Sequence, residues 1–257
     1  MHIKNMSSSG RVRAVPLLLW VAGAALLATS GCAAWRIGQS ADLARESEPW
    51  QQRPGGAAKR LLIVGDSTAV GTGASSAERS LAGLIGKAHP GLVIENRARD
   101  GAKFSDILSQ LSVDTRFDFV LVQGGGNDII RLTSLPELMA DIGQVAERAS
   151  QSADQVILMP AGNVGNAPLF FPPVSWWMTQ RSRKLHTFVR EAAERNNAFY
   201  INLFHETQDD PFVLDPSLNA RDGLHPSDAG YAVWYQALLQ QGGALLSTER
   251  VLPTHTQ

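Results

Sequence analysis

Short apolar runs that alternate with helical segments constrain the fold of this chain from Leu61 onward. Five runs are typical of buried strands: 61–64, 92–96, 117–122, 156–159 and 198–203. Apolar residues at helical spacing predict helices in the segments 81–88, 104–111, 135–150, 175–196 and 228–239. Strands that alternate with helices form a mostly parallel sheet covered by helices on both faces. The sequence therefore predicts a single α/β domain.

Small and polar residues follow three of the predicted strands. The first strand runs into Gly65, Asp66 and Ser67, Gly101 comes a few residues after the second, and the third ends in the segment 123–128. The carboxyl ends of parallel strands share one edge of the sheet, which is where open α/β sheets bind ligands. We therefore expect these three segments to meet around Ser67.

A serine needs a base to become a useful nucleophile. Of the six histidines, only His225 has a carboxylate three residues upstream in a turn-like segment, Asp222-Gly223-Leu224-His225. Such a turn can bring Asp222 to one ring nitrogen and leave the other nitrogen facing Ser67. The alternative is a loop histidine that is merely paired with Asp222.

Hydrolysis at a carbonyl also needs hydrogen-bond donors for the developing oxyanion. The backbone N–H groups of Ser67 and Gly101 and the side-chain amide of Asn127 are the candidates. The alternative for 124–126 is a simple tight turn, and Asn127 could instead cap the following helix.

Together these segments resemble the four sequence blocks of the SGNH (GDSL) hydrolase family. The blocks are Gly65-Asp66-Ser67, Gly101, Gly125-Gly126-Asn127-Asp128 and Asp222-Gly223-Leu224-His225, and they follow the family's order and approximate spacing. The resemblance implies a flavodoxin-like three-layer α/β/α sandwich with about five parallel strands. It also implies Ser67 as nucleophile, His225 as base, Asp222 as the group that orients it, and Ser67, Gly101 and Asn127 as oxyanion donors. Thr68 stands where many members have leucine.

Two more carboxylates lie near the predicted nucleophile. We expect Asp66 to accept hydrogen bonds from loop amides and Asp128 to cap the following turn. The spacing of the His, Cys and Asp residues fits no metal site, so we predict neither a metal nor another cofactor.

The long connection 161–178 follows the fourth strand, at the same edge as Ser67. Connections of this length in compact domains are often functional. Its aromatic side chains are candidates for the wall of an acyl or aryl pocket, and a satellite hydrophobic cluster is the alternative. These residues are Phe170, Phe171, Trp176 and Trp177.

The N-terminus resembles an export signal. Lys4, Arg11 and Arg13 precede an apolar run, 14–28, of signal-peptide length. Cys32, the single cysteine, follows small residues as in a lipobox and is a candidate for lipid attachment. A secreted form and an uncleaved membrane anchor are the alternatives. All three place the domain outside the cytoplasm: membrane-anchored, periplasmic or secreted.

The sequence divides into four parts on this basis. Residues 1–31 are a signal peptide or anchor, 32–59 a linker, 60–245 the hydrolase domain and 246–257 a C-terminal tail. The linker assignment for 39–59 depends on its prolines, glycines and mixed charges without a clear period.

The formal net charge of −1 provides no basic surface for nucleic acid. The expected function is a serine esterase acting on small-molecule, lipid or glycan esters, with acetyl, short acyl or lysophospholipid-type substrates. An acyltransferase using the same triad is one alternative. A non-catalytic ligand-binding module of flavodoxin-like fold is another, but it would not require a paired base and orienting acid.

Overall fold

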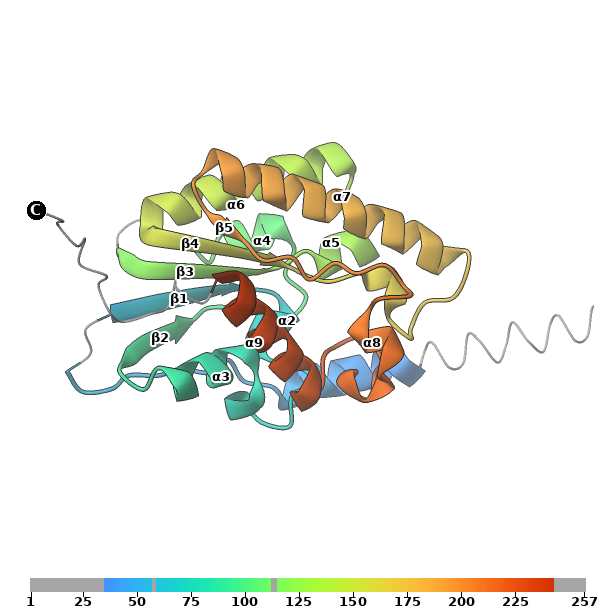
Figure 1. The fold of residues 1–257 in the computed structure, drawn as a ribbon, viewed down its shortest axis with the longest axis horizontal. Helices are drawn as coiled ribbons and strands as arrows, with labels where there is room; N and C mark the ends of the chain where they lie inside the picture. The colour runs from blue at the N-terminus through green and yellow to red at the C-terminus, as the bar shows by residue number, and fades with distance from the viewer. Residues whose placement is uncertain (1–34, 57–58, 112–114, 243–257) are drawn as a thin grey trace, which may run out of the picture.

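One sheet of five parallel strands organises the molecule (Figure 1), which is a computed structural model that describes residues 35–56, 59–111 and 115–242. The strand order is β2-β1-β3-β4-β5. The chain thus moves outward from β1 to β2 and then returns to the other side of β1, which opens a crevice at the carboxyl ends of the central strands. The strands are β1 (Lys59–Gly65), β2 (Leu92–Asn96), β3 (Phe117–Gly124), β4 (Ala153–Pro160) and β5 (Phe199–Tyr200).

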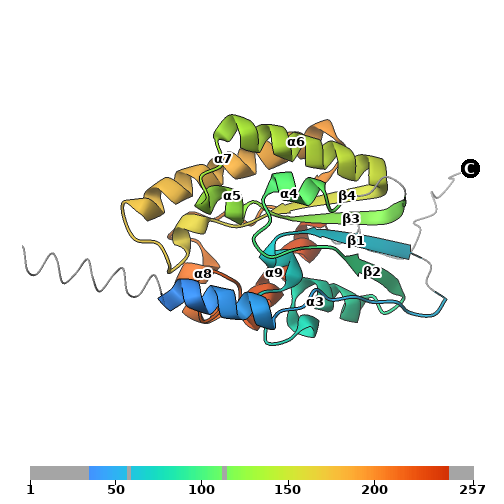
Figure 2. The ribbon, with the colours of Figure 1, turned by 180° about the vertical axis from the view of Figure 1, so that it is seen from behind.

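Alternate side chains of the central strands pack into two separate cores, one on each face of the sheet. Leu62 and Val64 of β1 belong to one core, and Leu61 and Ile63 belong to the other. The first core is covered by α4 (Phe104–Leu108), α6 (Leu135–Ser152) and α7 (Val174–Arg195), and the second by α3 (Leu81–Ala88) and α9 (Asp228–Gly242). Figures 1 and 2 show these helices on opposite faces of the sheet. The predicted three-layer α/β/α fold is confirmed.

Short helical turns occupy several of the connections. The segment that starts at Ser67 begins with one helical turn. The fifth strand is shorter than its apolar run predicts, because only two of its residues pair with β4. The short helices are α2 (Ser67–Val70), α5 (Gly126–Ile130) and α8 (Pro211–Leu214), with 3₁₀ turns η1 (Ala77–Arg79), η2 (Val164–Asn166) and η3 (Pro216–Leu218).

Residues 35–46, which lie within the segment 32–59 assigned to a linker, are helical and pack on the domain. Leu43 of this segment is buried, and Figure 2 shows the helix, in blue, beside α8. Tertiary contacts stabilise this helix, and they are not visible in the local sequence pattern. The signal segment with Cys32 and the C-terminal tail lie outside the described residues, so their assignments stay predictions.

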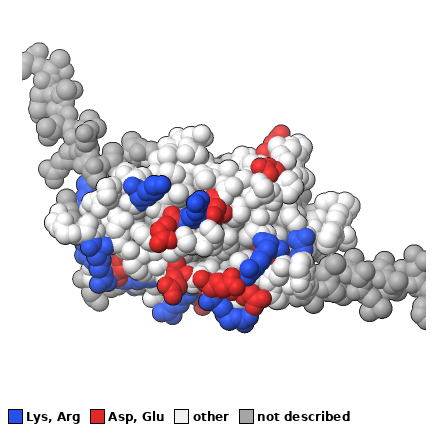
Figure 3. Space-filling view, turned by 90° about the horizontal axis from the view of Figure 1, so that it is seen from below, with Lys and Arg blue, Asp and Glu red and all other residues white. Residues whose placement is uncertain are grey.

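No helix among the described residues is both long and apolar enough to cross a membrane. On the face shown in Figure 3, basic and acidic side chains are interspersed between wide uncharged areas. This face therefore lacks the single-signed charge that attracts a polyanion.

Candidate active site

Ser67, His225 and Asp222 lie in one hydrogen-bonded row. The Ser67 Oγ is 2.8 Å from His225 Nε2, and His225 Nδ1 is 2.6 Å from Asp222 Oδ2. All three residues are buried or nearly so. The structure thus brings together the three residues expected to form the triad, although Ser67 and His225 are 158 positions apart. The two ring nitrogens have the partners that a general base needs.

The turn after β1 places Ser67 at the first position of α2. Asp66 caps this turn, because its Oδ1 accepts hydrogen bonds from the Thr68 N–H at 2.9 Å and from the Thr68 hydroxyl at 2.7 Å. The expected structural role of Asp66 agrees with these contacts. The first N–H of a helix has no partner within the helix, so the Ser67 N–H is available to an oxyanion.

Asp222 is held as a carboxylate by four donors. Oδ1 accepts from the backbone N–H groups of Leu224 and His225, and Oδ2 accepts from His225 Nδ1 and from the Ser40 hydroxyl. Burial opposes ionisation, but the hydrogen bonds and the charge of His225, together with the Ser40 hydrogen bond, lower the pKa of Asp222 to about 2. The residue is therefore ionised at neutral pH and can stabilise an imidazolium.

The other two predicted oxyanion donors lie in the same cavity as Ser67. Gly101 and Asn127 both line it, and no side-chain hydrogen bond to Asn127 forms within the described part of the chain. Gly101 has a left-handed φ of +74°, a conformation that glycine adopts without cost. A Cβ at this position would also lie 2.9 Å from the Arg131 guanidinium.

Asp128 joins the segments that carry Gly101 and Asn127. One carboxylate oxygen accepts from the Phe104 N–H at 3.0 Å, and the other accepts from the Thr133 hydroxyl at 3.0 Å. Burial raises the pKa of Asp128. Asp128 thus does more than cap the following turn as expected: it also anchors the start of α4, just after Gly101, to α5.

The cavity around Ser67 has a volume of about 660 Å³. Of the four aromatic residues expected to line it, only Phe170 does so. Phe171, Trp176 and Trp177 do not, and 48–68% of their surface is exposed. The chain turns at this point into α7, whose first turns project Trp176 and Trp177 away from the cavity.

Several residues that line the cavity were not predicted from the sequence. They come from four segments far apart in the chain, which the fold brings to one edge of the sheet. These residues are Ile37, Ser40, Ala41, Ala44, Ile130, Arg131, Leu203 and Trp234.

His186 is a second buried histidine, in an environment different from that of His225. Its Nε2 is 2.8 Å from the Ala161 carbonyl and its Nδ1 is 2.6 Å from the Tyr200 hydroxyl. Burial lowers the pKa of His186 to about 4. This histidine is therefore a neutral core residue, and it contacts neither Ser67 nor a carboxylate.

Asp66 predicts a specific dependence of stability on pH. Burial raises its pKa from 3.8 to about 6, against the opposing hydrogen bonds from Thr68. Between these two values the folded protein keeps a proton that the unfolded chain has lost, so the free energy of unfolding falls as pH rises. Relative to Asp66→Asn, the wild type should lose up to about 3 kcal/mol between pH 4 and pH 7. Urea unfolding at several pH values measures this difference, and a difference that stays constant would contradict the assignment.

Ser67, His225 and Asp222 are linked in this order at the carboxyl edge of a parallel sheet, and the three predicted oxyanion donors line the same cavity. This arrangement is that of an ester hydrolase of the SGNH type. The family model for the GDSL-like Lipase/Acylhydrolase family matches residues 63–233, and the chain belongs to this family. Among curated proteins, none matches the chain.

Several solved structures have the same fold, and the match extends over nearly the whole length of each of them. TesA superposes with a TM-score of 0.58 and 18% sequence identity, covering 73% of this chain and 99% of TesA. Axe2, an acetylxylan esterase from Geobacillus stearothermophilus, superposes with a TM-score of 0.54 and 22% sequence identity, covering 76% of this chain and 99% of Axe2. LAE5, an α/β hydrolase from the metagenome of Lake Arreo in Spain, superposes with a TM-score of 0.57 and 21% sequence identity, covering 74% of this chain and 98% of LAE5. At these identities the likeness concerns the fold.

Proposed function

We propose that this protein is a serine esterase that hydrolyses carboxylic esters through an acyl-Ser67 intermediate. The observation that carries the proposal is the hydrogen-bonded row Ser67–His225–Asp222 opening onto a cavity. Neither a binding module nor a structural domain requires a base and an orienting carboxylate in line with a serine.

The arrangement of donors and acceptors supports a two-step reaction. In the first step Ser67 Oγ attacks the ester carbonyl while His225 Nε2 takes its proton, and the ionised Asp222 stabilises the resulting imidazolium. The N–H groups of Ser67 and Gly101 and the Asn127 amide receive the oxyanion. The imidazolium then protonates the departing alkoxide, which leaves as the alcohol. In the second step water, activated by His225, releases the carboxylic acid and restores Ser67.

The lining of the cavity favours an acyl group longer than acetyl. Apolar side chains from several elements surround the space next to Ser67, and burial of each methylene there contributes about 0.8 kcal/mol. A volume of about 660 Å³ is ample for an acyl chain of several carbons. Axe2 is named as an acetylxylan esterase, so acetyl esters are the competing substrates. The apolar lining residues are Ile37, Ile130, Leu169, Phe170, Leu203, Phe212 and Trp234.

A series of p-nitrophenyl esters from acetate to decanoate tests this proposal. We expect the purified full-length protein to hydrolyse the series and kcat/KM to rise with chain length beyond acetate. Phe170→Ala removes an apolar wall and should lower kcat/KM for the longer esters about 10-fold, which corresponds to one to two methylene contacts. The same variant should change kcat/KM for the acetate ester much less.

Trp176→Ala is the matched control, because Trp176 is an aromatic residue of the same connection that lies outside the cavity. It should leave the chain-length profile unchanged. No hydrolysis of any ester would overturn the proposed activity, whereas a profile that peaks at acetate would overturn the acyl preference only.

A further inference from the structure

The helical segment 35–46 contacts the loop that carries the histidine and its aspartate. The Ser40 hydroxyl donates a hydrogen bond of 2.5 Å to Asp222 Oδ2, the same oxygen that faces His225 Nδ1. This segment lies outside residues 63–233, the part matched by the family model. The contact therefore comes from a part of the chain that the family model does not match.

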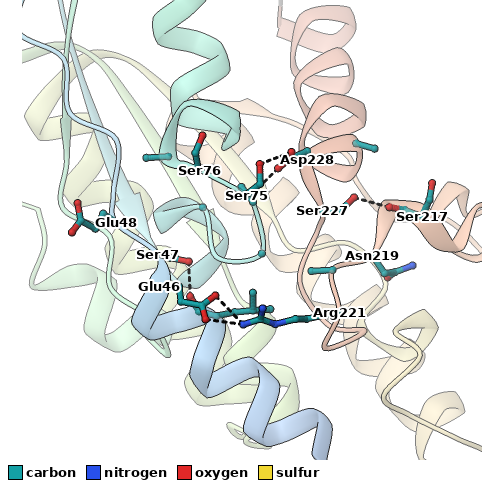
Figure 4. Close-up of a pocket in the computed structure, with 17 residues that line it drawn as sticks. Glu46, Ser47, Glu48, Ser75, Ser76, Ser217, Asn219, Arg221, Ser227 and Asp228 are labelled. Atoms are coloured by element: carbon teal, nitrogen blue, oxygen red, sulfur yellow. Dashed lines mark hydrogen bonds and ion pairs between the residues drawn. The ribbon is translucent and has the colours of Figure 1, made fainter.

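Two further contacts hold the segment in place along the same loop. The Glu46 carboxylate accepts from the Arg221 guanidinium at 2.8 and 3.0 Å, as Figure 4 shows at the edge of a second cavity. Near the other end of the segment, the Arg36 guanidinium covers Gly223, where any side chain would collide with it. Gly223 has a left-handed φ of +67°. Ser40 is thus fixed by contacts on both sides of it.

The face of the segment that carries Ser40 also forms part of the cavity wall. Ile37, Ala41 and Ala44 line the cavity that contains Ser67, and their spacing of four and three residues places them on one face of a helix. The segment therefore reaches the Asp222 carboxylate and the substrate space at the same time.

We propose that Ser40 is a positioning residue of the active site, which orients the Asp222 carboxylate toward His225, and that helix 35–46 is a functional wall of the site. The inference rests on the proposed function. Asp222 is fully buried, and a buried carboxylate requires donors for its lone pairs. Without Ser40, Oδ2 keeps His225 as its only donor, so the carboxylate rotates more freely and aligns the imidazole less well.

Substitutions at Ser40 in the full-length protein test the role of the hydroxyl. Ser40→Ala should lower kcat for an ester substrate about 10-fold, the loss expected for one hydrogen bond to a charged group, with KM changed less than about two-fold. Ser40→Thr keeps a hydroxyl and Ser40→Val has nearly the same shape without one. We expect Ser40→Thr to retain most of the wild-type kcat and Ser40→Val to lower kcat as much as Ser40→Ala does.

Ser47→Ala is the matched control, because the Ser47 hydroxyl bonds to the Leu43 carbonyl and contacts no residue of the triad. It should keep the wild-type kcat. Equal kcat in Ser40→Thr and Ser40→Val, or a wild-type kcat in Ser40→Ala, would overturn the proposal.

A spectroscopic measurement separates this inference from the proposed activity. The proton shared by His225 Nδ1 and Asp222 gives a far-downfield ¹H signal, which should shift in Ser40→Ala and Ser40→Val but not in Ser47→Ala. This signal does not depend on turnover. An unchanged signal overturns the role of Ser40, whereas absence of hydrolysis by the wild type overturns the esterase proposal.

Discussion

Ser67→Ala should abolish ester hydrolysis, with kcat reduced by about 10⁴-fold or more, the scale of loss of a catalytic nucleophile. The variant keeps the oxyanion donors and the cavity but has no atom that can form the acyl intermediate. Its fold should be unaffected, because the Ser67 hydroxyl bonds only to His225 among the described residues. Steady-state kinetics with a p-nitrophenyl ester measures the loss, and thermal unfolding checks the fold.

A fluorophosphonate probe examines the same prediction without a substrate. It should label the wild type but not Ser67→Ala. It should also label Ser109→Ala, because Ser109 is exposed and its hydroxyl bonds to the Asp106 carbonyl and to no residue of the triad. Labelling of Ser67→Ala at the wild-type rate would place the reactive serine elsewhere in the chain.

Asp222→Asn should lower kcat by about 10⁴-fold while leaving the fold intact, because it forces the wrong tautomer of His225. The asparagine oxygen can still accept from Leu224 N–H and His225 N–H. Its amide group, however, donates toward Nδ1, so that Nε2 carries the hydrogen and can no longer take the proton of Ser67. Kinetics at neutral pH, with thermal unfolding as the check on folding, measures this effect.

Asp66→Asn is the matched control for this variant, since Asp66 is also buried and precedes the nucleophile directly. Its carboxylate bonds to Thr68 rather than to a histidine, so its loss of kcat should be far smaller. Comparable losses in the two variants would contradict the assignment of Asp222 as the orienting acid.

The fold could be predicted from the sequence because local pattern and tertiary structure agree along the core. Leu61 to Val64 form a run with no polar residue, which is typical of a strand buried on both faces, and both faces of β1 are indeed covered by cores. Helix α6 was predicted to within two residues, since its apolar residues follow a helical period. The residues brought together around Ser67 could be predicted because the ends of parallel strands share one edge.

Helix 35–46 could not be predicted in this way. It has a glycine at position 38 and a mixture of polar and small residues, and no local pattern indicates its stability. Its contacts are to Asp222 and Arg221, which lie about 180 positions away, and such contacts are invisible in a local reading. For the same reason Ser40 was not a candidate for the site.

The positions of the aromatic side chains in the connection 161–178 could be predicted only in part, for a related reason. Composition identifies 161–178 as a segment rich in large apolar side chains, but the direction of each side chain depends on where α7 begins. Phe170 precedes the helix and faces the cavity, whereas Trp176 and Trp177 lie within its first turns and face outward.

The wide separation of Ser67 and His225 along the chain makes catalytic competence a property of the completed fold. Their contact depends on docking of α9 and its preceding loop: the Tyr231 hydroxyl bonds to the Thr72 carbonyl, Asp228 bonds to Ser75, and Gly73 packs against His225. A chain in which α9 has not docked has a sheet and a serine but no base. Titration of the active serine with a covalent probe consequently counts only the molecules in which α9 has docked. The fraction of protein that reacts with the probe therefore measures the fraction that is completely folded.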